Sequence, residues 1–304
     1  MIKLDSYGEP DRGPWRHPYI VVQPGLRRLL HDLKPEQTLP WSKLAAGTDL
    51  AQVEHLDIWS DRESVAEALP PWLPQLTHLK WLGLPSQICD RLRPDMLPPG
   101  VTWLKARIEY DQRPAARRRA VFAEAARFAE VEQLGTSQDC YLCTVNYAFG
   151  VETFPNLEHL GLKLDAKGRM LPVIAAQKRL QVLRLRGFGQ LAETAQRLAP
   201  LGLAALSLGG THRHADLTGI GALASLRHLK LVGFSAVTDL APLRELPLLE
   251  SIGLYWMPRL ADIGPLLGMP SLKKIGSFGC KAKKHWRQDL DRATERGIDL
   301  SHAL

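Results

Sequence analysis

The sequence has no long apolar run, no secretory leader and no cysteine framework, and each absence excludes a class of protein. No apolar stretch in its 304 residues approaches the roughly 18 needed to cross a bilayer, so an integral membrane protein is not expected. A secretory leader needs a continuous apolar segment near its start, and Asp5, Glu9 and Asp11 interrupt that stretch here. We therefore predict a cytoplasmic protein. The four cysteines are few and irregularly spaced, which favours reduced thiols. They are Cys89, Cys140, Cys143 and Cys280.

Motifs for catalysis, cofactors and metals are also weak. Gly187–Ala192 reads GFGQLA and matches a dinucleotide fingerprint, but the strand before it is in phase with a repeat, so we expect no cofactor there. The H-x-H-x-D group at 212–216 could hold a metal, although Asp216 has a structural explanation in its repeat position. Cys140 and Cys143 form half of a zinc knuckle with no obvious second half. We predict a protein that is not an enzyme and has no cofactor or metal.

What the sequence does contain is a short leucine pattern, L-x-x-L-x-L, that returns every 23 residues between Leu157 and Phe278. This periodicity is typical of leucine-rich repeats, in which each repeat supplies one strand of a parallel sheet. The pattern is kept for five repeats and weakens in the sixth. The first leucines of the six repeats are Leu157, Leu180, Leu203, Leu226, Leu249 and Leu272.

Upstream of Leu157 the pattern is less regular. Core triplets begin at Val53, Leu79 and Val101, and we place one more repeat with its core positions at Phe128, Val131 and Gln133. A helix is predicted from Ala115 to Ala126, since Pro114 suits a first helical turn and strong helix formers follow it.

These patterns divide the chain into three predicted parts. Residues 1–52 form an N-terminal cap and first coil, 53–278 form the repeat array, and 279–304 form a C-terminal cap. Within the array, the regular repeats cover 157–278, and irregular coils with an inserted helix cover 101–156.

Three aspartates also recur at the 23-residue interval, namely Asp216, Asp239 and Asp262. Each precedes a short turn whose free amide hydrogens a carboxylate can accept. The returns that follow, such as VTDLAPLRELPLLESIGL, resemble the leucine-rich repeats of bacterial internalins and of a regulatory subunit of a eukaryotic phosphatase. That resemblance implies a solenoid fold and protein binding. The asparagine of that class is absent here, which predicts an apolar turn in its place. Its slot holds Phe188, Thr211, Phe234, Met257 and Cys280.

The residues between the core leucines are the candidate site. Strand side chains alternate between two faces, so these residues form columns on the concave face of the predicted sheet. Tryptophan and arginine are common anchors of protein interfaces. The alternative is that the tryptophans pack against the N-terminal cap and that the basic residues are a solvated face. The predicted partner-binding residues are Trp59, Trp81, Trp103, Lys105, Arg107, His159, Lys163, Arg184, Arg186, His228, Lys230 and Tyr255.

Two basic clusters, at 113–119 and 273–287, support a competing hypothesis. With a formal net charge of +7, the chain favours acidic partners, and such clusters are typical of nucleic-acid or phosphate binding. They are equally typical of solvated cap surface.

The predicted fold class is an α/β solenoid, a curved leucine-rich repeat with a parallel β-sheet on the concave face and short helices or turns on the convex face. The predicted function is that of a monomeric, non-enzymatic scaffold that recognises a partner protein by its concave face. The residue usage is typical of bacteria, and a small repeat protein with no attached enzyme resembles immunity proteins that neutralise a cognate toxin. The alternative is a binder of nucleic acid or of a phosphorylated or acidic ligand.

Overall fold

The computed structural model describes residues 20–23, 38–40, 55–58, 69, 73–107, 119–135, 145–165, 167–280 and 286–300. The chain divides into two compact units. The N-terminal unit contains the described residues up to Leu162, and the C-terminal unit contains those from Lys163 onward. No helix in the described ranges is long and apolar enough to cross a membrane.

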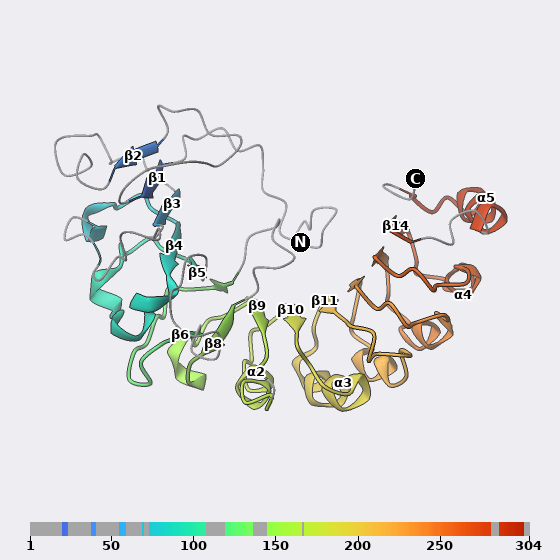
Figure 1. The fold of residues 1–304 in the computed structure, drawn as a ribbon, viewed down its shortest axis with the longest axis horizontal. Coiled ribbons are helices and arrows are strands. Elements are labelled where there is room, and N and C mark those ends of the chain that lie inside the picture. Colours follow the sequence, from blue (N-terminus) through green and yellow to red (C-terminus); the bar gives the residue numbers. More distant parts are fainter. Residues whose placement is uncertain are drawn as a thin grey trace. The chain divides into compact units, whose positions relative to one another are not determined.

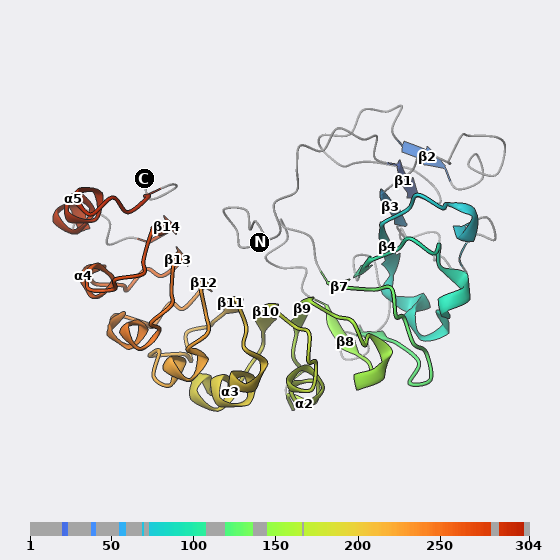
Figure 2. The same cartoon turned by 180° about the vertical axis from the view of Figure 1, so that it is seen from behind.

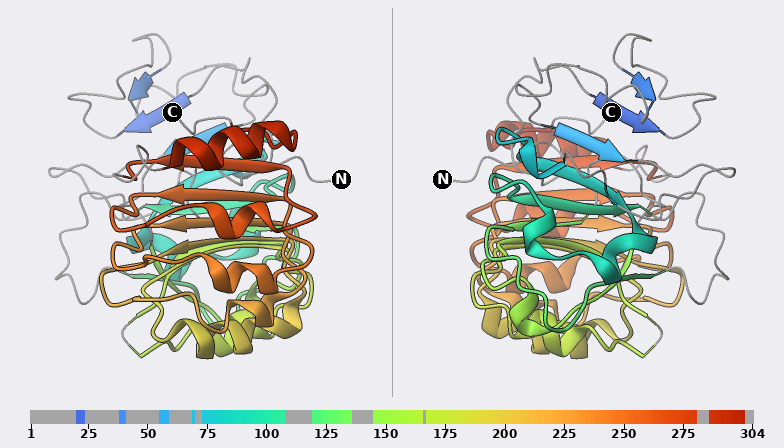
Figure 3. Two further views of the ribbon diagram at one scale, coloured as in Figure 1. Left: turned by 90° about the vertical axis from the view of Figure 1, so that its right-hand side faces the viewer. Right: turned by 90° about the vertical axis from the view of Figure 1, so that its left-hand side faces the viewer.

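The C-terminal unit contains five described strands of equal length, each starting 23 residues after the last. They pair in parallel without offset, so every strand residue lies beside the residue 23 positions later (Figure 3). The parallel sheet of an α/β repeat fold, predicted from the leucine spacing, is therefore confirmed. The strands are β10 (Val182–Arg186), β11 (Ala205–Gly209), β12 (His228–Val232), β13 (Ser251–Tyr255) and β14 (Lys274–Phe278).

The core leucines of successive strands stack on one another. Leu206 pairs with Leu229, which pairs with Ile252, and each of these side chains is 2% exposed. Burying one such side chain stabilises the fold by about 2 kcal/mol. A single coil cannot enclose its own leucines, so the stability of each coil depends on its two neighbours.

Short helices return the chain from one strand to the next, and they lie on one side of this sheet (Figures 1 and 2). Their apolar residues complete the core, as Ile220, Leu243 and Leu266 show by being fully buried. The helices are α2 (Leu171–Ala175), α3 (Leu191–Leu198), η8 (Ala199–Leu201), η9 (Ile220–Leu223), η10 (Ala241–Glu245) and α4 (Gly264–Leu267).

A final helix, α5 (Arg287–Glu295), follows the last strand and packs against α4. Trp286, just before it, is 1% exposed and donates its indole N–H to the carbonyl of Ala261 at 3.2 Å. An amphipathic helix in this place covers the apolar edge that the last coil would otherwise expose to water.

The recurring aspartates lie at the start of the segments that connect one strand to the next, as the sequence predicts. In each case the backbone N–H two residues later donates to the Oδ1 of the aspartate, at 2.9 Å for Asp216, 2.8 Å for Asp239 and 2.9 Å for Asp262. The aspartate thus supplies an acceptor to a short helix that cannot satisfy its own first amides.

The turn after each strand is apolar, which also agrees with the sequence. Phe188 and Phe234 are buried at this turn position. Only the coil between them has a polar residue there, the exposed Thr211. There the ring of His214 fills the space, with its centroid 4.4 Å from that of Phe188 and 5.5 Å from that of Phe234.

The N-terminal unit has a parallel sheet in the order β9, β7, β5, β4, β3, β1, β2, and a separate parallel pair of β6 and β8. Its described short helices are η3 (Leu73–Gln75), η4 (Ser86–Arg91), η5 (Pro94–Met96) and η7 (Val151–Thr153). The strands are β1 (Ile20–Gln23), β2 (Thr38–Pro40), β3 (His55–Ile58), β4 (Trp81–Pro85), β5 (Trp103–Arg107), β6 (Arg119–Val121), β7 (Gln133–Leu134), β8 (Asn146–Ala148) and β9 (His159–Lys163).

Aromatic rings fill the irregular part of this unit. Phe122, Phe128 and Phe154 lie within 5.0 to 5.8 Å of one another, centroid to centroid. Tyr147 packs beside Phe122, and its hydroxyl accepts the amide hydrogen of Ala106 at 3.0 Å. Rings of this size fill the wider space left by coils that are longer than 23 residues.

Two predictions in this region are wrong. The repeat placed at Phe128, Val131 and Gln133 is shifted by three residues, because Leu134 pairs with the second core leucines of its neighbours, Leu104 and Leu160. Val131 therefore takes the first core position, and Gln133 points to the other face.

The helix predicted from Ala115 to Ala126 is also wrong in its described part. Arg119–Val121 is the strand β6, paired with β8. Ala120 and Phe122 are buried, whereas Val121 between them is 40% exposed. This alternation of burial fits a strand, and it outweighs the helical propensity of the alanines.

Removing one aspartate tests the role of the turns. Asp239→Ala should lower the free energy of unfolding by about 1 kcal/mol, since the N–H of Ala241 loses its acceptor. Asp239→Asn keeps an acceptor oxygen and should stay close to wild type. Chemical denaturation measures both. Equal stability of the alanine variant and wild type would show that the recurring aspartate does not stabilise the turn.

Candidate binding face of the C-terminal unit

The side of the C-terminal sheet that bears no helices is the candidate functional site. We call it the open face, and define it by the first, third and fifth residues of β10 to β14. In β10 the leucines between these residues are buried and the residues themselves are half-buried. In the other strands some positions of this face are buried as well, among them Ala205, Val232 and Tyr255.

The open face is basic. Among its fifteen positions are four cationic side chains and no aspartate or glutamate. One cation at the end of the sheet, Lys274, faces the Asp299 carboxylate, with Nζ and Oδ2 3.4 Å apart. The face therefore attracts anionic groups. The four cations are Arg184, Arg186, Lys230 and Lys274.

Glycines on this face provide space for the long side chains of neighbouring positions. A Cβ added at Gly209 would lie 2.6 Å from the Cγ of Arg186, which places that side chain directly over the glycine. A Cβ at Gly253 would lie 2.7 Å from the ring of Tyr255. The two residues are thus held flat along the sheet instead of projecting from it.

Tyr255 and Lys230 form a cation–aromatic pair on the open face. The Nζ of Lys230 lies 4.6 Å from the centroid of the Tyr255 ring, within the range of a cation–π contact. Tyr255 is 7% exposed, so the ring mainly supports the cation above it. Both residues were predicted as partner-binding, and the structure brings them together.

Trp256 is a candidate that the sequence analysis missed. It follows β13, and it is the one described residue other than glycine with a positive φ, at 51°. The equivalent residues in the coils before and after are Gly233 and Gly279, with φ of 74° and 69°. A non-glycine residue in this conformation costs about 1 to 2 kcal/mol. The observable signal was a tryptophan in a column of glycines.

Despite this strain, Trp256 is 44% exposed. Its ring centroid lies 5.8 Å from that of Phe278 and 6.3 Å from that of Tyr255. Phe278, the last residue of β14, is 55% exposed. Exposed aromatic rings beside a basic face are typical of binding surfaces in proteins.

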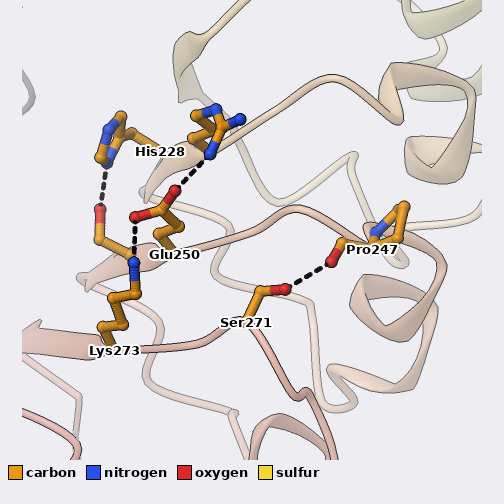
Figure 4. Close-up of polar contacts among 7 residues, drawn as sticks. His228, Pro247, Glu250, Ser271 and Lys273 are labelled. Atoms are coloured by element: carbon orange, nitrogen blue, oxygen red, sulfur yellow. Dashed lines mark hydrogen bonds and ion pairs between the residues drawn. The ribbon is translucent and has the colours of Figure 1, made fainter. Parts of the chain in front are cut away.

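A polar band borders the open face at the start of the strands (Figure 4). Glu250 accepts hydrogen bonds from Lys273, at 2.8 Å, and from Arg227 in the adjacent coils. These two bonds hold the pKa of the Glu250 carboxyl below its ordinary value. Within the open face, the Nδ1 of His228 lies 2.8 Å from the Ser251 hydroxyl, and burial lowers the pKa of the imidazole.

The predicted site residues are spread over both units. Lys163, Arg184, Arg186, His228, Lys230 and Tyr255 belong to the C-terminal unit, and the other predicted residues precede it in the chain. Trp59 lies outside the described residues, and Arg107 is described only as the end of β5. His159 is half-buried, and burial lowers the pKa of its imidazole.

Two of the predicted partner-binding residues, Trp81 and Lys105, are buried. Trp81 is 4% exposed, and Lys105 is 8% exposed with its Nζ 5.8 Å from the Trp81 ring. Trp103 is half-buried and contacts Trp81 edge to face, with 6.1 Å between the centroids. Rings buried in this way stabilise the fold.

The candidate metal-binding group at 212–216 has structural partners within the fold. The Thr211 amide donates to the Nδ1 of His214 at 3.0 Å, so Nε2 bears the hydrogen and donates to the Gly189 carbonyl at 3.1 Å. Of the H-x-H-x-D group, both His214 and Asp216 are thus engaged in turns. Over the described residues, histidine, cysteine, aspartate and glutamate side chains form no group of three or more with metal-binding geometry. Cys140 and Cys143 lie outside those residues.

Comparisons with known proteins do not identify a family for this chain. The chain matches no family model, and no curated protein matches it. Among solved structures it is similar to a leucine-rich repeat protein of Leptospira interrogans, with 13% identity and a TM-score of 0.23, over 76% of this chain and 80% of the other. A TM-score this low does not establish a shared fold, so the repeat fold rests on the strand register described above.

Burial of His228 predicts a pH dependence. Its pKa is lowered, so folding favours the neutral ring; stability is complete above the unfolded pKa of about 6.5 and is lost as pH falls through the folded pKa. The His228 imidazole should titrate by NMR with a midpoint below 6.5. His228→Gln should lose less stability than wild type on acidification below that pH. A midpoint at or above 6.5 would contradict the burial argument.

Proposed function

We propose that this protein is a non-catalytic scaffold that binds a partner protein through the open face of its C-terminal unit. The sheet register supports the proposal, because it stacks the variable positions of successive coils into one continuous surface. Mutations in such columns can change recognition without disturbing the leucine core on the other side.

The observation that carries the proposal is the composition of the open face. Its fifteen positions include two aromatic residues and four cations, of which Lys274 is paired with Asp299, but no acidic residue, although the chain as a whole has 32 aspartates and glutamates. An ordinary solvated surface intersperses both signs of charge. Arginine and aromatic residues are the groups that contribute most to protein interfaces.

We also propose that the coils of the C-terminal unit form a leucine-rich repeat solenoid of the class indicated by their sequence. The aspartate turns and the apolar turn column support this assignment. A narrower role as an immunity protein that neutralises a cognate bacterial toxin remains a prediction from residue usage and from a small repeat array without an attached enzyme.

The competing hypothesis of nucleic-acid binding has less support. In the 273–287 cluster, Lys273 is hydrogen-bonded to Glu250, and Lys274 is paired with Asp299. Charges engaged in this way release fewer counterions when a phosphate binds. Residues 281–285 and 113–118 lie outside the described residues.

Charge reversal on the open face tests the proposal. Protein capture from the native cell with wild type should recover a partner that the double variant Arg184→Glu, Lys230→Glu loses by at least about tenfold. The control is Lys178→Glu, which reverses a single charge at an exposed turn before β10 and should retain the partner. Retention by the double variant, or recovery of nucleic acid instead of protein, would overturn the proposal.

A further inference from the structure

The aromatic residues at the end of β13 and β14 form a distinct feature beside the open face. Trp256 and Phe278 are the two large apolar residues of the C-terminal unit most exposed among those described, and their rings meet nearly at right angles, at 89°. Lys230 lies on the neighbouring Tyr255. We propose that this group is the anchoring site for an acidic peptide segment of the partner protein, with an apolar side chain held against the two rings and carboxylates on the basic face. This inference rests on the proposed function.

The backbone supports a role beyond packing. Glycine occupies the corresponding turn position in the coils before and after, at Gly233 and Gly279, and the chain there takes the same left-handed conformation. Trp256 adopts that conformation at the expense of strain, yet nearly half of its surface remains in contact with water. Backbone strain that a glycine would avoid, at a residue whose side chain is 44% exposed, points to a function for the side chain.

The surroundings are shaped to hold the indole in place. A Cβ added at Gly279 would lie 2.5 Å from Cδ1 of Trp256, so the ring rests directly on that glycine. The Trp256 amide donates to the Phe278 carbonyl at 2.8 Å, which fixes the turn that projects the ring. A ring held in this way loses little conformational entropy when a partner binds, which favours affinity.

The charge of the open face defines the chemistry of the partner. Arg184, Arg186 and Lys230 lie on strands preceding the aromatic pair, and no acidic side chain shares their face. A peptide that places an apolar residue at Trp256 and continues across the strands would therefore meet cationic and neutral positions and no acidic one. Carboxylates on such a peptide would be attracted to this face, whereas a basic peptide would be repelled.

The ring geometry favours a peptide over a nucleic acid. Bases bind by stacking on open ring faces. Here the exposed rings stand edge to face, and the Tyr255 ring is 7% exposed beneath Lys230. Two perpendicular rings suit an aliphatic or aromatic side chain packed against their exposed surface better than a flat base.

A random peptide display library, selected on the immobilised full-length protein, tests the inference. The enriched peptides should have an apolar residue flanked by aspartate or glutamate. The synthesised peptide should bind Trp256→Gly at least about tenfold more weakly than wild type. The glycine variant should unfold at the same denaturant concentration as wild type or higher, because glycine relieves the positive φ.

The matched control is Leu248→Ala. Leu248 is 42% exposed, close to the 44% of Trp256, but it lies before β13, at the opposite end of the strand. Its removal should leave peptide affinity unchanged. Single-stranded oligothymidylate should not compete with the peptide.

The outcomes separate this inference from the proposed function. Peptides that lose affinity with the double variant Arg184→Glu, Lys230→Glu but not with Trp256→Gly would refute the aromatic anchor and leave the open face as the binding surface. Affinity unaffected by either change would refute both. Failure to enrich acidic peptides, or displacement by oligothymidylate, would overturn the choice of partner.

Discussion

The unshifted pairing of parallel strands is the constraint on which the C-terminal unit depends. Each residue of β10 to β13 lies beside the residue 23 positions later in the next strand. One face of the sheet is therefore built from the core leucines, and the other from the residues that lie between them. A slip of one residue would exchange the two faces. The aspartate turns and the buried phenylalanines fix the coil length that prevents such a slip.

This constraint separates stability from recognition. The leucines of each strand pack against neighbouring coils, whereas Arg186 and Tyr255 lie over glycines on the open face. Trp256 is the exception, because it adds strain to the fold at the turn it occupies. Its exposure and its contact with Phe278 give the unit an aromatic edge next to a basic surface.

The sequence predicted the features that depend on local periodicity. The strand positions in the regular repeats, the aspartate turns and the apolar turn column all follow from the 23-residue spacing, and the structure confirms them. The register at Val131 and Leu134 was missed because long returns on either side remove the phase information. Burial of Trp81 could not be foreseen, since it depends on which segments pack over that strand. Trp256 does not follow from the leucine pattern, because it lies in the turn after β13, where the equivalent residues of the neighbouring coils are the glycines Gly233 and Gly279.

Residue-resolved amide hydrogen exchange of the full-length protein tests the register most directly. Three turn amides donate to the next coil, from Gly210 to Val232, from Gly233 to Tyr255 and from Trp256 to Phe278, each at 2.8 Å. The account predicts that these three amides exchange as slowly as those of the central strands, because all of them open only when neighbouring coils separate. Exchange at the rate of an unprotected peptide would contradict the stacked coils, and with them the face on which the proposed recognition depends.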